Sequence, residues 1–409
     1  MSSSEPEFND AREYSSLEEV MNTLLTAKGK SFRELDQTGR ALTGGNKGSL
    51  GQIIEESVLK YAINSDAAPD IHIGDTSYEL KVTPLKHIKK GKQTSAKERL
   101  VIDIINYLTL ADETDFESSK MWDKAKNIIL VYYYDDRTDK KKELRIDCKV
   151  LASYLMKYEA DDLATIKNDW HVIRDKVASG HADSLSESDT NYLAACTKGA
   201  NSKQLREAPA PAGANTATIF AKQRAFSLKT SYMTAIARKL LNRKSETVRL
   251  PIPQEQNLDE YVAAKFIPYT GKSSRDIASE LQVSAAPTAK NYNSSLAFAM
   301  LGASKSSISK IEQFSKANIS QFKSVTIYPD GLPREHMSFK AITDDQWEEW
   351  AIPKPHGNSH SYATSSKPAS SLSWFQNRRY RINPAMTKRR TFSKVHSFGI
   401  CLKTTLNNT

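Results

Sequence analysis

The segment 71–85 constrains the fold more than any other part of this sequence. Its β-branched and aromatic residues flank Gly74-Asp75, a pair that favours a two-residue hairpin turn because glycine readily adopts positive φ. A turn at this point sets the register of both strands and places Asp70 opposite Glu79. The sequence therefore predicts an antiparallel hairpin that brings two carboxylates together.

Lys81 follows Glu79 by two residues, so its side chain is expected on the same face of the strand. Cross-strand neighbours have Cβ atoms about 4.5–5.5 Å apart, and two acids this close either repel or share a hard cation. Two acids and a lysine suit metal-dependent phosphodiester hydrolysis, in which a divalent ion polarises a phosphoryl oxygen and acidifies a water. A surface ion pair between Glu79 and Lys81 is the structural alternative.

A third acid is expected from the segment 47–63, whose apolar residues recur at the spacing of an amphipathic helix. On a helical wheel, Glu55 and Glu56 flank the apolar face almost symmetrically. Either side chain could reach a metal beside the hairpin, and the helical pattern alone does not choose between them.

Strand and helix patterns alternate over the first 245 residues. We expect further strands at 99–105, 128–134 and 144–150, and helices at 17–27, 31–37, 161–178 and 230–241. We expect a surface loop at 208–214 and a linker at 243–258. The predicted first domain, 1–245, is therefore α/β with a mixed or mostly antiparallel sheet.

An internal repeat predicts a second domain, 246–350. Gly29–Leu35 recurs as Gly271–Ile277, and the same offset of 242 carries Glu79-Leu80-Lys81 onto Gln321-Phe322-Lys323. At this offset Ala297 stands where Glu55 does and Gln321 where Glu79 does, so the second copy is expected to be non-catalytic. The counterpart of 222–241 would fall at 464–483, and the second copy is therefore expected to be incomplete.

The positive charge is concentrated in the last 59 residues. The chain has 58 Lys and Arg and 48 Asp and Glu over 409 residues, which gives a net charge of +10. Residues 351–409 contain ten Lys and Arg and no Asp or Glu. We interpret this tail as the product of a reading-frame shift; the alternative is a disordered basic arm that binds phosphates.

Other features favour a cytoplasmic protein. The longest apolar run, 128–134, is too short to cross a membrane, and the N-terminus lacks the pattern of a secretory signal. Three widely spaced cysteines exclude a disulfide framework and a cysteine-based zinc site.

Several motifs resemble the MutH superfamily of GATC-specific endonucleases. They are Lys-Gly-Ser-Leu-Gly-Gln-Ile-Ile-Glu at 47–55, Asp70 with Glu79-Leu80-Lys81, the stretch 97–107, Thr-Lys-Gly-Ala-Asn-Ser-Lys at 197–203, and Lys-Gln-Arg-Ala-Phe-Ser-Leu-Lys at 222–229. The register of the first motif selects Glu55 over Glu56. Ser227 stands where the mismatch-repair branch has Tyr, which points to the type II restriction branch, whose members also carry a second, inactive copy of the fold.

The resemblance implies a restriction-endonuclease-like fold, with a mixed sheet flanked by helices, that cuts double-stranded DNA at GATC. It implies Mg²⁺ held by Asp70 and Glu79 with support from Glu55, and a water assisted by Lys81. The expected DNA-binding residues are Lys198, Gly199, Asn201, Ser202, Lys203, Arg224 and Lys229. Lys198 would read purine edges, while Arg224 and Lys229 would contact phosphates.

Two other functions stay open at this point. One is a MutH-like mismatch-repair endonuclease that nicks one strand, and the other is a catalytically impaired remnant that only binds DNA. Self-association on DNA is also left open, and no membrane partner is expected.

Overall fold

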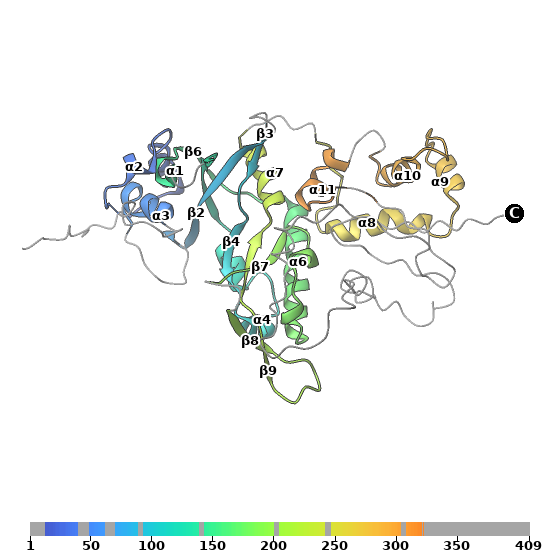
Figure 1. Ribbon diagram of the computed structural model, residues 1–409, viewed down its shortest axis with the longest axis horizontal. Helices are drawn as coiled ribbons and strands as arrows, with labels where there is room; N and C mark the ends of the chain where they lie inside the picture. Colours follow the sequence, from blue (N-terminus) through green and yellow to red (C-terminus); the bar gives the residue numbers. More distant parts are fainter. Residues whose placement is uncertain are drawn as a thin grey trace, which may run out of the picture. The chain divides into compact units, whose positions relative to one another are not determined.

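The computed structural model describes residues 13–39, 49–61, 70–88, 93–138, 143–199, 204–241, 247–303, 308–320 and 322. The chain divides into two units, Met1–Ala263 with Ser306–Ile319 and Ala264–Lys305 with Ser320–Thr409. Figure 1 shows the elements of each unit. No helix in the described ranges is long and apolar enough to cross a membrane.

The main sheet of the first unit is mixed, as the sequence predicts. Its order is β1-β2-β5-β6, and β3 pairs with the far end of β2. The strands are β1 (Ile71–Ile73), β2 (Thr76–Ile88), β3 (Gln93–Ala96), β5 (Ile128–Tyr134) and β6 (Val150–Leu155). β2 runs parallel to β5 and antiparallel to β1 and β3, while β6 runs antiparallel to β5.

A second sheet supports the segments expected to contact DNA. It has the antiparallel order β4-β10-β7, formed by β4 (Leu100–Ile104), β10 (Arg224–Leu228) and β7 (Leu193–Thr197). Between β7 and β10 the chain forms a two-stranded ribbon, β8 (Leu205–Pro209) with β9 (Thr218–Lys222). Figure 1 shows this ribbon at the lower end of the unit.

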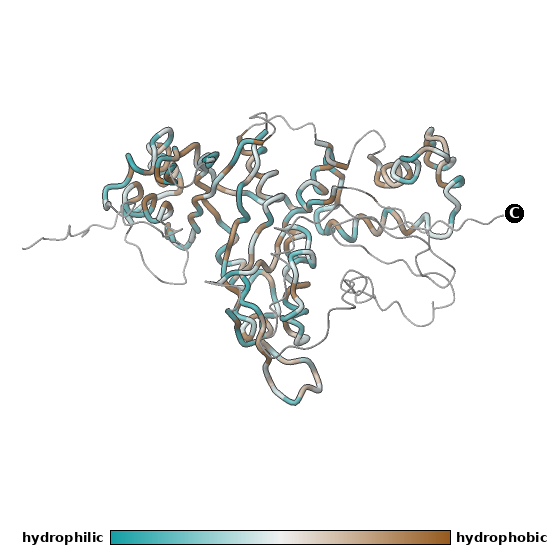
Figure 2. The backbone as a smooth tube through the Cα atoms, in the orientation of Figure 1, coloured by the Kyte–Doolittle hydropathy of each residue, from teal (hydrophilic) through white to brown (hydrophobic). Residues whose placement is uncertain are grey.

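Helices cover the sheets of the first unit. They are α1 (Leu17–Leu25), α2 (Phe32–Leu35), α3 (Ser49–Gln52), α4 (Tyr107–Asp112), α5 (Lys120–Ala125), α6 (Ala160–Ala178), α7 (Thr230–Leu240) and α11 (Glu312–Lys316). Phe32, Ile53 and Ile54 pack with Ile129 and Val131 of β5 in one buried cluster. Hydrophobic stretches, brown in Figure 2, run along the strands of this unit. Burial of these apolar side chains is the main force that stabilises the arrangement.

The second unit contains α9 (Ser274–Glu280) and α10 (Tyr292–Met300), and α8 (Leu258–Phe266) spans the boundary between the two units. Tyr292, Leu296 and Met300 of α10 are buried. Tyr292 Oη donates a hydrogen bond to the Ser274 carbonyl, 3.0 Å, which ties α10 to α9.

Several sequence predictions are confirmed closely. The strand expected at 128–134 is β5, and the helices expected at 161–178 and 230–241 are α6 and α7 within one residue at each end. Ser16 caps α1 as its sequence pattern indicates, because Ser16 Oγ accepts a hydrogen bond from the Glu19 amide, 3.2 Å.

Three local predictions are wrong. The strand expected at 144–150 is a 3₁₀ turn at Arg145–Asp147, and the strand β6 starts only at Val150. The apolar residues of 144–150 alternate as they would in a strand. The amides of Asp147 and Cys148, however, donate to carbonyls three residues earlier, as in a 3₁₀ helix. The expected loop 208–214 begins inside β8, and the helix expected at 47–63 ends at Val58.

Candidate active site

The hairpin that carries the predicted catalytic residues has the register expected from its turn. Ile73 pairs with Thr76, and Ile71 with Tyr78. Gly74 has φ +56°, a conformation that residues with a Cβ rarely adopt. Asp70 lies just before β1, where its Oδ2 accepts a hydrogen bond from the Leu80 amide, 2.7 Å. Asp70 is therefore held beside Glu79 and Lys81, as predicted.

Glu79 and Lys81 lie together on β2. Lys81 Nζ donates a hydrogen bond to Glu79 Oε1, 2.5 Å. The Glu79 residue is only 6% exposed, and burial raises the pKa of its carboxyl group despite the nearby lysine. Its second oxygen, Oε2, is buried and has no hydrogen-bond partner among the described residues. A buried carboxylate oxygen without a partner is costly unless a proton or a cation compensates it.

Glu55 reaches the same place from a distorted helix. After α3 the chain continues as the π-helical turn η2 (Ile53–Val58), in which Ile53 and Ile54 are buried. The turn ends at Val58, five residues short of the predicted end, and Lys60 just after it has φ +60°. π-helical turns inside helices are frequent at functional sites.

The pKa of Glu55 shows how closely the four residues interact. Burial raises this pKa to about 7, the negative charges of Asp70 and Glu79 add to the rise, and the positive charge of Lys81 opposes it. The structure thus brings Glu55, Asp70, Glu79 and Lys81 within electrostatic reach of one another.

A divalent cation would need several oxygen ligands close together at this site. Within the described part of the chain, no group of three His, Cys, Asp or Glu side chains is arranged so as to hold a metal ion. The chemistry of the site nonetheless fits one. Glu79 Oε2 has no partner among the described residues, and burial raises the pKa values of Glu55 and Glu79, so a cation would stabilise the charged form of both carboxyl groups. Oxygen ligands of this kind are those that Mg²⁺ prefers.

Lys124, for which the sequence carries no signal, also lies near Glu79. This residue lies in α5, its ammonium is 3.2 Å from Asp103 Oδ1, and its charge lowers the pKa of Glu79. The Glu79 amide donates to the Asn127 carbonyl, 2.9 Å, which joins β2 to the chain that follows α5. A lone lysine over 40 residues from Glu79 carries no sequence signal of this proximity; only the parallel pairing of β2 with β5 creates it.

The expected DNA-reading segment follows β7. Lys198 and Gly199 are exposed, and the Lys198 amide donates to the Gln223 carbonyl, 3.0 Å. Asn201, Ser202 and Lys203 lie outside the described residues.

Arg224 and Lys229 both contact the backbone around β7. Arg224 Nη1 donates to the Ala195 carbonyl, 2.8 Å, and Lys229 Nζ donates to the Thr190 carbonyl, 2.5 Å. Both side chains are partly buried, and burial lowers the pKa of Lys229. Phosphate contact by these two residues stays a prediction, since their bonds here support the strand itself.

Asp169 on α6 fixes the start of β7. Its carboxylate accepts hydrogen bonds from the amides of Asn191, Tyr192 and Leu193, at 2.8, 2.6 and 2.9 Å. Burial raises the pKa of Asp169 to about 7, although Lys229 and the three amides favour the charged form. The sequence offered no signal of this role.

The raised pKa of Asp169 predicts a pH-dependent stability. A carboxyl group whose folded pKa lies above its unfolded value, 3.8, binds more protons in the folded state between these limits. The free energy of unfolding should therefore fall as the pH rises from 4 to 7. This group contributes a decrease of up to about 1.4 kcal/mol per pH unit. Urea unfolding of wild type and Asp169→Asn across this range checks it; equal slopes would contradict it.

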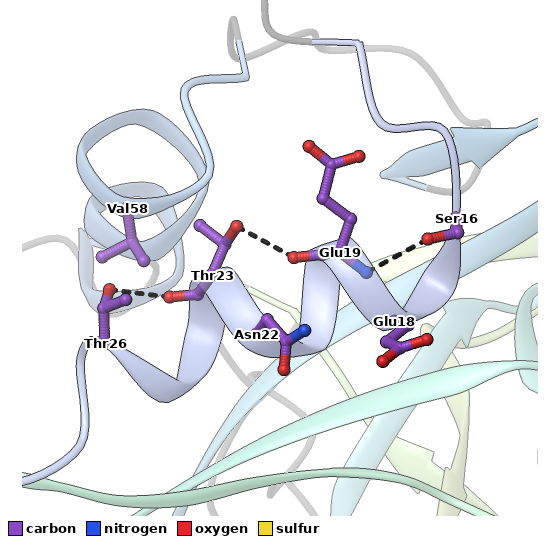
Figure 3. A pocket seen from close by; sticks show the side chains of 7 residues that line it. All are labelled: Ser16, Glu18, Glu19, Asn22, Thr23, Thr26 and Val58. Atoms are coloured by element: carbon purple, nitrogen blue, oxygen red, sulfur yellow. Dashed lines mark hydrogen bonds between the residues drawn. The ribbon is translucent and has the colours of Figure 1, made fainter.

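A surface pocket lies elsewhere, along α1. Figure 3 shows its lining, which consists of Ser16, Glu18, Glu19, Asn22, Thr23, Thr26 and Val58. Thr23 Oγ1 and Thr26 Oγ1 donate to carbonyls of the same helix. None of the four predicted catalytic residues lines this pocket, so the pocket is separate from the candidate active site.

Known DNA endonucleases are similar to this chain. The family model described as DNA mismatch repair enzyme MutH matches residues 59–169, a range that contains Asp70, Glu79 and Lys81. The type II restriction enzyme Sau3AI of Staphylococcus aureus is 35% identical over 349 residues, 82% of this chain and 68% of that protein. The DNA mismatch repair protein MutH of Shewanella woodyi is 26% identical over 225 residues, 54% of this chain and 90% of that protein.

The fold and site define a nuclease of the MutH type. The chain belongs to the MutH superfamily and, within it, to the branch of type II restriction enzymes. It is a site-specific DNA endonuclease, and the resemblance inferred from its motifs is confirmed.

Proposed function

We propose that this protein is a Mg²⁺-dependent type II restriction endonuclease that hydrolyses both strands of double-stranded DNA at GATC, in the cytoplasm. The observation that carries the proposal is the convergence of Asp70, Glu79, Lys81 and Glu55 around the start of β2. Three acids and one lysine are the groups that metal-assisted phosphodiester hydrolysis requires.

Each of these residues has a separate task in the proposed reaction. Asp70 and Glu79 would hold Mg²⁺, with Glu55 supporting a second ion. The bound cation would polarise the scissile phosphate and acidify a water. Lys81 would orient that water and stabilise the negative charge that develops on the phosphate. The bond from Leu80 to Asp70 keeps the first carboxylate in place before any ion binds.

DNA recognition would fall to the end of β7 and the loop after it. Lys198 is exposed and can pair with a guanine edge. Gly199, Asn201, Ser202 and Lys203 would complete the reading loop. Arg224 and Lys229 would act on phosphates at the margins of this segment.

The second unit would be a non-catalytic copy of the first domain's helical part. At the offset of 242, Gly29 (φ +82°) matches Gly271 (φ +88°), and Lys60 (φ +60°) matches Gly302 (φ +72°). A capping box opens both α2 and α9, at matching residues. Ala297, the counterpart of Glu55, is buried in α10. Gln321, the counterpart of Glu79, lies outside the described residues.

The counterpart of the first hairpin strand differs from β1, and by its contacts it lies in the first unit. Positions 313–315 correspond to β1 but belong to helix α11, so the counterpart of the first hairpin strand is helical. This difference supports a second unit that binds DNA or regulates cleavage rather than cutting.

Plasmid cleavage tests the proposed function directly. With Mg²⁺, we expect linear fragments from a plasmid that contains GATC and none from a matched plasmid without it. Addition of EDTA should stop the reaction, because the carboxylates alone cannot polarise the phosphate. Nicked circles only would favour a strand-nicking repair enzyme, and a gel shift without products would favour a DNA-binding remnant.

A further inference from the structure

Two glutamines meet where the expected recognition loop joins the rest of the fold. Gln204 precedes β8, and Gln223 lies between β9 and β10. Gln204 Nε2 donates a hydrogen bond to Gln223 Oε1, 3.0 Å, and the Gln223 amide donates to the Gln204 carbonyl, 2.9 Å. The Gln223 carbonyl in turn accepts from the Lys198 amide, 3.0 Å. The pair therefore lies directly beside Lys198, at the base of the loop.

The bond between the two side chains fixes the orientation of the Gln223 amide. A glutamine amide has two N–H donors and an oxygen with two acceptor positions. Gln204 occupies one acceptor position of Gln223 Oε1. Among the described residues, Gln223 Nε2 makes no hydrogen bond. Gln223 can therefore still accept one hydrogen bond at Oε1 and donate from Nε2.

Adenine presents the complementary pair of groups in the major groove. Its N7 accepts a hydrogen bond and its N6 amino group donates one, and glutamine recognises both at once. Gln223 Nε2 can donate to N7 while Oε1 accepts from N6 and from Gln204 together. The surroundings suit a DNA backbone as well, because Lys198 and Lys222 on either side are exposed.

We propose that Gln223 reads an adenine of the recognition sequence and that Gln204 is the positioning residue that orients its amide. This inference rests on the proposed function and adds to it a residue that determines specificity. The competing role for the pair is purely structural, as a link between the start of β8 and the end of β9.

Modified substrates separate reading from a structural role. Short duplexes are prepared with adenine or with 7-deaza-adenine, which lacks the N7 acceptor, in the GATC site. Cleavage is measured in single turnover and affinity by fluorescence anisotropy, for wild type, Gln223→Leu, Gln223→Glu and Gln204→Leu. Gln254→Leu, an exposed glutamine in the segment before α8, is the matched control.

Wild type and Gln254→Leu should prefer adenine over 7-deaza-adenine by about 5- to 150-fold, the usual range for a bidentate base contact. Gln223→Leu should lose a similar factor on natural DNA and show no preference between the two duplexes. Gln223→Glu keeps the side-chain size but cannot donate to N7, so it should behave in the same way. Gln204→Leu should retain part of the preference.

Equal activity of wild type on both duplexes would overturn the proposal. So would a Gln223→Leu variant that is weaker on both duplexes yet keeps the wild-type preference, since that is the result of a structural role. If wild type does not cleave the GATC duplex, the proposed function itself fails; if it cleaves, only the role of Gln223 is in question.

Discussion

Replacing Lys81 with alanine should reduce the rate of DNA cleavage by at least about 100- to 1,000-fold, the usual loss when one group that stabilises transition-state charge is removed. The Lys81 ammonium is 2.5 Å from Glu79 Oε1, close enough to act on a water or phosphate bound beside that carboxylate. DNA binding should change little, because the expected reading residues follow β7 rather than lie on β2. Single-turnover cleavage and gel shift on the same GATC duplex measure the two effects separately.

Lys28→Ala serves as the control for this substitution, because Lys28 is exposed at the end of α1 and lies outside the proposed site. It should cleave at the wild-type rate. Unchanged cleavage by Lys81→Ala would remove this lysine from the mechanism, whereas loss of binding together with cleavage would point to a general disturbance of the fold.

Replacing Lys316 with methionine should lower the free energy of unfolding by about 3–5 kcal/mol, the usual cost of breaking a buried ion pair by removal of one partner. Lys316 is 2% exposed, and its ammonium lies 2.7 Å from Asp162 Oδ2 and 2.7 Å from Glu312 Oε1. Asp162 is fully buried on α6, and burial already raises its pKa. Without the lysine, the Asp162 carboxyl group must either bind a proton or carry a buried charge that no cation compensates, and both destabilise the folded state.

Two further variants make this stability prediction specific. Lys167→Met on the same helix as Asp162 breaks an exposed pair with Glu117, 2.6 Å, and should cost no more than about 1 kcal/mol. The double variant Asp162→Asn with Lys316→Met should regain part of the loss, because no buried charge remains. Urea unfolding at pH 7 measures all three; a Lys316→Met effect no larger than that of Lys167→Met would show that the pair stabilises little.

The ion pair belongs to a larger contact of α11 with α6, α7 and the chain around Leu250. Gln313 of α11 is fully buried, where its Nε2 donates to Asp161 Oδ2 and to the Leu250 carbonyl, each at 3.1 Å. Ser231 on α7 donates to the Lys316 carbonyl, 2.7 Å. The segment that returns at 308–319 is thus part of the first unit, although the sequence places it far beyond the predicted end of the first domain at residue 245.

The sequence by itself determined the active-site hairpin. A Gly-Asp turn and a period of two set the register of β1 and β2, and they predicted that Asp70, Glu79 and Lys81 lie together. These are short-range constraints, in which turn chemistry and alternation act within about ten residues. The continuous apolar run of β5 also predicted a strand, because a strand that is buried on both faces needs no alternation of polar and apolar residues.

Only the tertiary structure decided what depends on distant packing. Lys124 approaches Glu79, Asp169 supports β7, and Lys316 is buried against Asp162, and each of these contacts joins segments more than 20 residues apart. A charged residue carries no local sign of whether it will be solvated or buried. That outcome follows from which helix packs on which strand, and the free energy of this packing is shared over the whole core.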